Sequence, residues 1–135
     1  MSPDDFAPWP RSSPFGDHAG PLLFRRNEEG LTFAVTIEER HTNARGTAHG
    51  GMLATFADLA LGYAAAFSTD PPTPLQTANL NLDLLSPAQV GDFVTATPRV
   101  LRVGSRLAHA EVTLLVGSRA VARANCVAAV SAPRA

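Results

Sequence analysis

One stretch of this sequence limits the fold more than any other. Residues 50–67, "GGMLATFADLALGYAAAF", contain no proline and a single charged side chain, Asp58. The segment is rich in Ala and Leu, and the "STDPPTP" that follows holds prolines that cannot continue a helix. We therefore predict one helix of about five turns. Because such a helix is apolar on all sides, the rest of the chain has to cover it.

The segments on either side of this helix predict strands. Ahead of it, "PLLFRRN" and "LTFAVTIEER" flank the turn "EEG" and predict a hairpin, with alternating apolar residues in the second strand. After it, "TANLNLDLL", "DFVTATPRVLRV", "RLAHAEVTLLV" and "RAVARANCVAAV" alternate with period two and are divided by turn sequences. The predicted order is strand, strand, helix and four strands. This order indicates an α+β fold in which an antiparallel sheet wraps around one long central helix.

The N-terminal segment differs in composition from the rest of the chain. Residues 1–20 are rich in Pro, Ser, Gly and Asp, so we expect a loop-like arm with a short helical turn around residues 6–9. The 135 residues, 45% of them hydrophobic, suffice for one compact domain with its own core. The predicted organisation is an arm over residues 1–20 and one domain over residues 21–135.

Charge and cysteine content exclude several classes of function. The formal net charge is −1, and no basic stripe or acidic tail suggests binding to nucleic acid or to a membrane. The single cysteine, Cys126, favours a reducing compartment, and the acids and prolines of "MSPDDFAPWP" do not resemble a signal peptide, so we expect a cytoplasmic protein. His18, His41 and His109 lack the spacing of metal ligands. We expect neither a metal site nor a cofactor.

Because the helix is expected to be covered on all sides, we predict that Asp58 lies inside, and its carboxylate then needs an explanation. Burying an ionised carboxylate without partners costs several kcal/mol, a large share of the stability of a domain of this size. One explanation is structural, because Asp58 could accept a hydrogen bond from a neighbouring strand or cap another element. The other explanation is a catalytic role.

The segment before the helix favours a site. "NARGTAHGG" places Gly50 and Gly51 at the helix N-terminus, where unpaired amides and the positive end of the helix dipole can receive an oxyanion. Glycine permits a ligand to approach the backbone closely, and His49 supplies a side chain that exchanges a proton near neutral pH. A histidine before two glycines also occurs as an ordinary loop residue, so this motif alone does not decide between the two explanations.

The loop and helix together resemble the hotdog-fold acyl-CoA thioesterases, in particular the phenylacetic acid degradation subfamily. The family pattern is Asn, two variable residues, Gly, two variable residues, His-Gly-Gly, and an Asp nine residues after the His. The matching residues here are Asn43, Gly46, His49, Gly50, Gly51 and Asp58. The strand "TANLNLDLLSPAQVGD" is also similar and carries Thr77 where related enzymes place Ser or Thr. The resemblance extends over residues 21–130 and leaves out the arm.

The resemblance implies a hotdog fold and hydrolysis of an acyl-CoA thioester to a free acid and coenzyme A. It implies that the Gly50 amide polarises the thioester carbonyl and that Asp58 either activates water as a base or attacks as a nucleophile. In this interpretation Thr77 holds the water, while Asn43 and His49 order the loop and the sulfur side of the substrate. The sequence does not distinguish the two roles of Asp58.

The spacing of these groups predicts a homodimer. Thioester hydrolysis requires an oxyanion donor and a base or nucleophile around one carbonyl carbon. Gly50 and Asp58 are eight residues apart on one helix, which is about 12 Å, so they cannot act on the same carbonyl. Two helices that lie antiparallel about a two-fold axis bring Gly50 of one chain to the partner subunit's Asp58. We expect a homodimer, or a tetramer made of two such dimers.

Coenzyme A binding is expected at a turn near the subunit interface, as the resemblance implies. The turn "LRVGSRLA" offers Arg102, Gly104, Ser105 and Arg106, and Gly51 adds a backbone group. The alternative for these arginines is solvated surface charge, and Gly104 and Ser105 would then simply form a hairpin turn.

Three functions from different classes therefore remain. The first is a thioesterase acting on small hydrophobic or aromatic acyl groups. The second is a hotdog-fold hydratase or dehydratase, which would require a His and an acid placed together for proton transfer at adjacent carbons. The third is an acyl-CoA binding protein without catalysis, which would tolerate the loss of Asp58.

Overall fold

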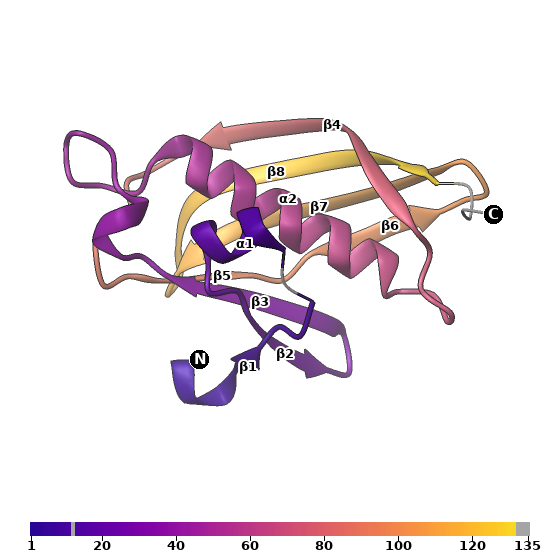
Figure 1. The fold of residues 1–135 in the computed structure, drawn as a ribbon, viewed down its shortest axis with the longest axis horizontal. Coiled ribbons are helices and arrows are strands. Elements are labelled where there is room, and N and C mark those ends of the chain that lie inside the picture. Colours follow the sequence, from indigo (N-terminus) through magenta and orange to yellow (C-terminus); the bar gives the residue numbers. More distant parts are fainter. Residues whose placement is uncertain (12, 132–135) are drawn as a thin grey trace.

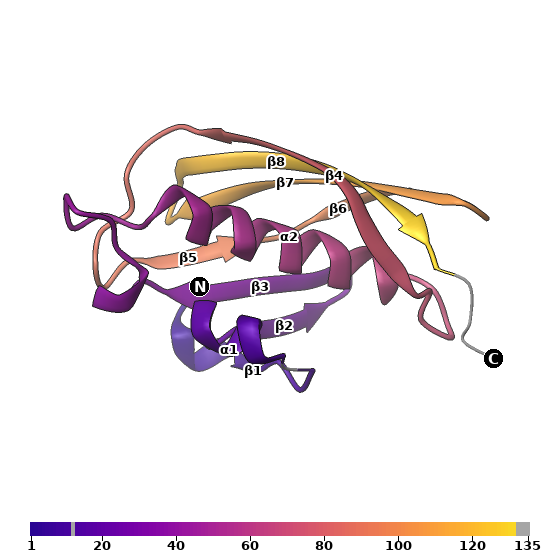
Figure 2. The same ribbon diagram turned by 45° about the horizontal axis from the view of Figure 1, so that its top comes forward.

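The structure is a computed structural model that describes residues 1–11 and 13–131. An antiparallel sheet curves around one long helix, α2 (Figures 1 and 2), and this confirms the predicted architecture. The elements in chain order are η1 (Pro3–Asp5), β1 (Ala7–Pro8), α1 (Pro14–Ala19), β2 (Leu23–Asn27), β3 (Gly30–Thr36), η2 (Glu39–His41), α2 (Gly50–Ala66), β4 (Leu75–Leu84), β5 (Phe93–Ala96), β6 (Arg99–Val103), β7 (Leu107–Val116) and β8 (Arg119–Val130).

Helix α2 has the predicted position and length, but the sheet covers only one side of it. The buried side includes Phe56 and Leu61, which pack into the core with Phe33 of β3. The opposite side, which carries Asp58 and Leu59, is only half-buried. The prediction that Asp58 lies inside is therefore wrong for a single chain, because one sheet wraps one side of the helix. Within the described part of the chain, no helix has the length and apolar character needed to cross a membrane.

The strands form one sheet in the order β1-β2-β3-β5-β7-β8-β4, and β6 pairs with β7 beside β5. The single strand predicted over residues 92–103 is wrong, since it is divided into β5 and β6, which pair with different parts of β7. Pro98 lies in the break, and it has no N–H to donate to a ladder. With the additional strand β1, the part of the chain that the structure describes forms a sheet of eight strands rather than the six predicted.

The predicted hairpin is confirmed, with Asn27 paired to Gly30 across the turn between β2 and β3. Strand β3 is buried on both faces, however, and not only on the apolar side. Thr32 exchanges a hydrogen bond with Thr97 over 2.9 Å, and Phe6 of the arm packs edge-on against Phe93 at a centroid distance of 5.3 Å. Part of the outer face of the sheet is therefore covered by the arm.

The arm is more ordered than its composition predicts. The expected helical turn around residues 6–9 is wrong, because Ala7 and Pro8 form β1 and pair with Phe24 and Leu23 of β2. Trp9 follows and is buried in the core, where burial of its large ring stabilises the segment more than Pro-rich composition disfavours order. The short helix α1 lies in front of α2 in Figure 1. The division of the chain at residue 20 stays a prediction.

Candidate active site

The loop before α2 is ordered by Asn43. Its Oδ1 accepts hydrogen bonds from the amides of Arg45 (2.9 Å) and Thr47 (3.2 Å), and its Nδ2 donates to the Thr47 hydroxyl over 3.0 Å. Gly46 adopts a φ of 80°, in the left-handed region that favours glycine. The Asn43 side chain thus makes its hydrogen bonds within its own loop, and these fix the approach of the chain to the helix.

His49 is the N-cap of α2 and engages one of the two glycine amides. Its Nδ1 accepts a hydrogen bond from the Gly51 amide over 2.8 Å, so the neutral imidazole carries its proton on Nε2 and can donate from there. Among the described residues, the Gly50 amide has no acceptor. A Cβ atom added to Gly50 would lie 2.7 Å from Leu84 Cδ1, so glycine suits the close packing at this end of the helix.

Asp58 and Thr77 meet across the gap between α2 and β4. The Thr77 hydroxyl donates a hydrogen bond to Asp58 Oδ1 over 2.7 Å. A bulge after Thr77 makes this contact possible, because Thr77 pairs with the buried Ala128 whereas Asn79 pairs with its neighbour Val127. Thr77 thus faces the helix, although Asn79, two residues on, faces outward.

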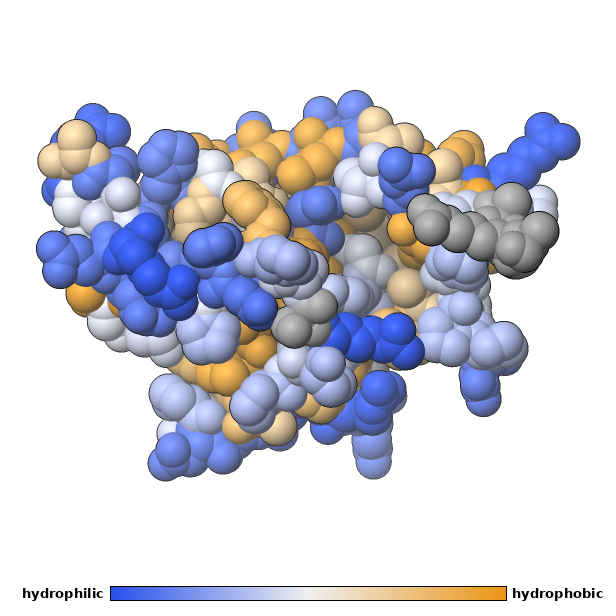
Figure 3. Space-filling model, viewed as in Figure 1, coloured by the Kyte–Doolittle hydropathy of each residue, from blue (hydrophilic) through white to orange (hydrophobic). Residues whose placement is uncertain are grey.

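A pocket of about 470 Å³ opens beside this pair, and we refer to it as the Asp58 pocket. Most of its lining is apolar, as expected of a site for a hydrophobic group. In the space-filling view, apolar residues gather along the upper edge of this face, where β4 runs in Figure 1 (Figure 3). The lining residues are Arg11, Asp58, Leu59, Gly62, Tyr63, Ala66, Phe67, Pro72, Thr73, Pro74, Leu75, Thr77 and Ala128.

The buried thiol of Cys126 is not a nucleophile in this arrangement. Burial raises the pKa of Cys126, and the nearby charge of Asp58 raises it further, against a smaller lowering by a hydrogen bond to the Ala110 backbone. A thiol with a raised pKa is protonated at neutral pH and reacts slowly. Asp58, which accepts the Thr77 hydrogen bond, is therefore the candidate reactive group of the pocket.

The structure separates the predicted site residues into three groups. Asp58 and Thr77 line the Asp58 pocket, whereas Asn43, His49, Gly50 and Gly51 lie together at the start of α2. Arg102, Gly104, Ser105 and Arg106 lie at the turn between β6 and β7, where the Gly104 amide donates to the Leu107 carbonyl over 2.8 Å. This turn does not line the Asp58 pocket.

Sequence reasoning missed Arg11, which also lines the Asp58 pocket. The family resemblance leaves out the arm, and no motif marks Arg11. The signal that could have found it is Trp9, a large apolar ring two residues earlier that binds the arm to the core.

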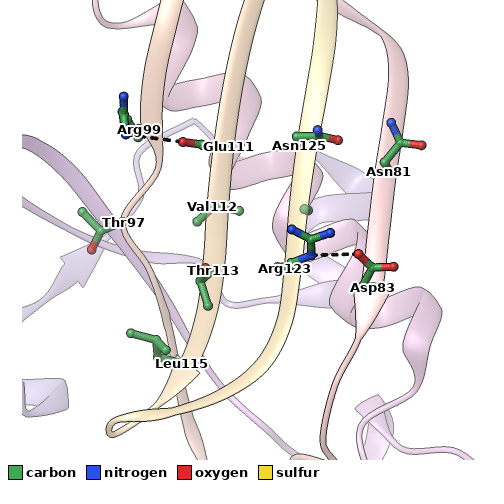
Figure 4. A pocket seen from close by; sticks show the side chains of 11 residues that line it. Asn81, Asp83, Thr97, Arg99, Glu111, Val112, Thr113, Leu115, Arg123 and Asn125 are labelled. Atoms are coloured by element: carbon green, nitrogen blue, oxygen red, sulfur yellow. Dashed lines mark hydrogen bonds and ion pairs between the residues drawn. The ribbon is translucent and has the colours of Figure 1, made fainter.

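A second and larger pocket, of about 560 Å³, lies on the outer face of the sheet (Figure 4). We refer to it as the outer-sheet pocket. Its charged side chains are paired with one another: Arg123 Nε lies 2.8 Å from Asp83 Oδ2, and Arg99 lies 3.7 Å from Glu111. Both pairs are drawn in Figure 4. These charges neutralise each other, so the larger pocket is a weaker candidate for catalysis.

Comparison with known proteins defines the class. Residues 45–126 match the model of the thioesterase superfamily. The chain is 46% identical over 126 residues to the Pseudomonas aeruginosa protein named "Putative esterase PA0474", covering 93% of this chain and 94% of that one. It is 36% identical over 86 residues to mouse acyl-coenzyme A thioesterase 13, covering 64% of this chain and 61% of that one.

Solved structures show the same fold. Zebrafish thioesterase superfamily member 2 matches with a TM-score of 0.79 and 26% identity over 89% of both chains. The PaaI protein of the Escherichia coli phenylacetic acid degradation operon matches with a TM-score of 0.71 and 22% identity, over 78% of this chain and 75% of that one.

The chain therefore belongs to the thioesterase superfamily and has the hotdog fold. This confirms the resemblance carried by residues 43–58 and identifies a thioester hydrolase. Of the three classes of function that the sequence left open, the family supports thioester hydrolysis.

Proposed function

We propose that this chain hydrolyses acyl-CoA thioesters to a free acid and coenzyme A. The observation that carries the proposal is the 2.7 Å hydrogen bond from Thr77 to Asp58 beside an apolar pocket of about 470 Å³. The name of the mouse relative supports coenzyme A as the thiol. So do two solved streptococcal structures of the same fold, one with coenzyme A and one bound to acetyl-CoA, at TM-scores of 0.72 and 0.75.

The Asp58 and Thr77 pair suits the activation of water. Because the Thr77 hydroxyl donates its proton to Asp58, its oxygen lone pairs are free to accept a hydrogen bond from a water molecule. The second carboxylate oxygen of Asp58 takes the proton as the water oxygen bonds to the thioester carbon. The C–S bond then breaks, and the thiolate of coenzyme A leaves and takes up the proton.

The alternative role of Asp58 is direct attack. The carboxylate oxygen would then bond to the thioester carbon and expel the thiolate, which leaves an acyl-aspartyl anhydride that water hydrolyses. Both mechanisms use the same position, so we retain both.

The Gly50 amide is the proposed oxyanion donor. It lies at the N-terminus of α2, where the helix dipole favours negative charge, and the Gly51 amide beside it is occupied by His49. The proton on His49 Nε2 lies on the side of the ring away from the Gly51 amide, where it could donate to the sulfur side of the substrate. Asn43 keeps the loop in place through its bonds to Thr47.

The proposed site is shared between two subunits. Gly50 and Asp58 are about 12 Å apart along α2, so one carbonyl cannot reach both in a single chain. Strand β4 ends the sheet order, and no other strand of residues 1–11 and 13–131 pairs with its ten-residue outer edge. Leu84 and Leu85 near the end of this strand are 56% and 52% exposed. Antiparallel pairing of this edge with its copy would place the half-buried face of α2 against the partner helix. A tetramer of two such dimers is the next level of assembly that we expect.

The turn between β6 and β7 is the proposed contact for the phosphates of coenzyme A. Arg102 and Arg106 are exposed there, and the planar guanidinium group suits phosphate oxygens. Ser105 would add a hydroxyl donor, whereas the Gly51 and Gly104 amides already donate to His49 and to the Leu107 carbonyl, so these glycines would contribute close approach of the backbone. Cytoplasmic location stays a prediction that rests on the single unpaired cysteine.

A panel of acyl-CoA thioesters tests this function, with the released thiol as the readout. We expect hydrolysis of at least one acyl class. A protein that binds the panel tightly but releases no thiol would instead be an acyl-CoA binding protein.

A further inference from the structure

The arm is fixed to the domain by a cluster of aromatic rings around Trp9. This ring is 8% exposed and packs against Phe24, Tyr63 and Phe67 at centroid distances of 5.0, 4.9 and 5.5 Å. Tyr63 and Phe67 also line the Asp58 pocket, so the arm is attached to a wall of the candidate site.

A second set of contacts holds the far end of the arm. The Arg40 guanidinium donates to the carbonyls of Asp17, His18 and Gly20 at the end of α1. The buried His41 accepts from the Glu38 amide on Nδ1, so its Nε2 donates to the Gly20 carbonyl over 3.1 Å. The arm is therefore anchored on both sides of residue 11.

Arg11 lies between these two anchors and lines the Asp58 pocket. The Tyr63 hydroxyl donates to the Arg11 carbonyl over 3.0 Å, which fixes the backbone. The guanidinium carbon lies 4.8 Å from the centroid of the Phe67 ring, within the range of a cation–π contact. Both the backbone and the side chain are thus held at the pocket, although Arg11 is exposed on its outer side.

Arg11 forms no ion pair within the described part of the chain, although it shares a small neighbouring pocket with Asp17. Among the described residues that line the Asp58 pocket, the only other charged side chain is Asp58. The remaining lining is apolar or carries a hydroxyl. The pocket thus has a carboxylate at the proposed reaction centre and a cation held over Phe67.

These two charges are separated along α2. Phe67 follows Asp58 by nine residues, which is about 13 Å along the helix axis. Side chains at the end of a helix point back toward the preceding turn, so we expect the distance from Asp58 to the Phe67 ring to be shorter than this. An extended alkyl chain advances roughly 1.3 Å per carbon from a C–C bond of about 1.5 Å. An acyl chain of about six to ten carbons therefore spans the separation.

We propose that Arg11 is a specificity-determining residue that selects acyl groups with a carboxylate at the end distant from the thioester. The inference rests on the proposed acyl-CoA hydrolysis and names its substrate class. The planar fork of arginine matches a carboxylate with two parallel hydrogen bonds, and the apolar lining accommodates the methylene chain between the two ends. The guanidinium group would form no ion pair with an acyl chain that ends in a methyl group.

Matched substrates test this inference. The ratio of kcat/KM is measured for adipoyl-CoA over hexanoyl-CoA and for suberoyl-CoA over octanoyl-CoA, so that each pair differs only in the terminal carboxylate. We expect the parent enzyme to favour the diacid thioester by about two- to fivefold, since a solvent-exposed ion pair is partly screened. Arg11→Gln should lower the ratio to about one, and Arg11→Lys should give an intermediate value. Arg26→Gln, an exposed arginine of β2 outside the pocket, is the matched control.

Binding without turnover gives a second readout. Trp9 is the only tryptophan of the chain, and it packs against two rings of the pocket wall. We expect hexanoate to change its fluorescence at a lower concentration than the uncharged hexanamide does, and Arg11→Gln to remove that difference.

Three results would separate the possible failures. Equal ratios in the parent and in Arg11→Gln, with hydrolysis intact, would overturn the role of Arg11. A uniform loss across all substrates in Arg11→Gln, with the ratio preserved, would place Arg11 on coenzyme A and also overturn it. Absence of hydrolysis of every thioester would reject the proposed function itself, while the fluorescence titration would still test the carboxylate preference.

Discussion

The Asp58 pocket and the outer-sheet pocket differ in how their charges are compensated. In the outer-sheet pocket, Asp83 is paired with Arg123 and Glu111 with Arg99. In the Asp58 pocket, the carboxylate accepts a hydrogen bond from the neutral hydroxyl of Thr77. A carboxylate with a neutral partner keeps its capacity to accept a proton or attack a carbonyl, whereas an ion pair lowers both. The smaller pocket is therefore the better candidate, and pocket volume is a poor guide here.

The difference arises from where each acid lies in the fold. Asp83 and Glu111 lie directly across from Arg123 and Arg99 on adjacent strands, the usual arrangement of stabilising cross-strand pairs. Asp58 lies on the helix face that the sheet leaves open, opposite a bulged strand. The position of each acid in its own element therefore decides whether a cation lies next to it.

Removing the two carboxylates separately is the strongest test of this comparison. We expect Asp58→Asn to lower kcat at least 100-fold, because the amide can neither accept the proton nor attack, and general base catalysis typically contributes about 10² to 10⁴. Asp83→Asn should leave kcat unchanged and alter the free energy of unfolding by less than about 1 kcal/mol, since its ion pair is exposed. Near-parental turnover by a folded Asp58→Asn protein would reject the mechanism.

The shared site is tested by combining two inactive variants. Gly50→Pro removes the proposed oxyanion donor, and such a loss costs about 100 to 1,000 fold in rate. When Gly50→Pro and Asp58→Asn chains are refolded together in equal amounts, half the dimers are mixed and each has one intact site of two. About a quarter of the parental activity should therefore return.

The controls for this mixture are each variant refolded alone, which should stay inactive, and circular dichroism to show that Gly50→Pro folds. Subunit exchange is confirmed with a mass tag. If exchange occurs and the mixture stays as inactive as its components, both groups act within one chain.

Thr77 should have a smaller effect than Asp58. Thr77→Val removes the hydroxyl that orients the carboxylate and the water, and we expect kcat to fall by about tenfold, as for loss of one positioning hydrogen bond. Thr77→Ser should retain most activity. Thr113→Val, which changes the same side chain in the outer-sheet pocket, is the control and should not alter kcat. Equal activity of Thr77→Val and Thr113→Val would remove Thr77 from the site.

The smallest effect is expected at Cys126. Because burial raises its pKa, the thiol stays protonated to higher pH than a free cysteine, and alkylation of the folded protein should be slow at pH 8 and accelerate as the pH rises further. Unfolding in guanidinium should expose the thiol to rapid alkylation. Cys126→Ala should keep kcat within about twofold. Rapid alkylation of the native protein with loss of activity would contradict this assignment.

The sequence predicted α2 well because the helix is long and ends at prolines that stop it. Strand β8 was predicted with its observed bounds for a similar reason, since alternation and a Gly-Ser turn define it. The break between β5 and β6 was missed, although Pro98 was visible, because the alternating pattern continues on both sides of it.

The contact between Asp58 and Thr77 could not be derived from alternation. Leu80 and Leu82 face the helix, and strict alternation back from them would place Ala78 inward and Thr77 outward. The bulge after Thr77 turns this side chain inward instead, and only the family resemblance indicated that Thr77 belongs to the site. Trp9 was missed because the average composition of the arm concealed one large apolar side chain.

The open edge of β4 has a consequence for handling this protein. A ten-residue strand with unpaired backbone groups accepts any complementary strand, and its own copy is the nearest match. Dilution dissociates the pair of copies and leaves the edge of β4 open to partially unfolded chains or to other proteins. The usual advice to store a protein dilute to avoid precipitation would then be reversed, and a concentrated stock would be the safer one.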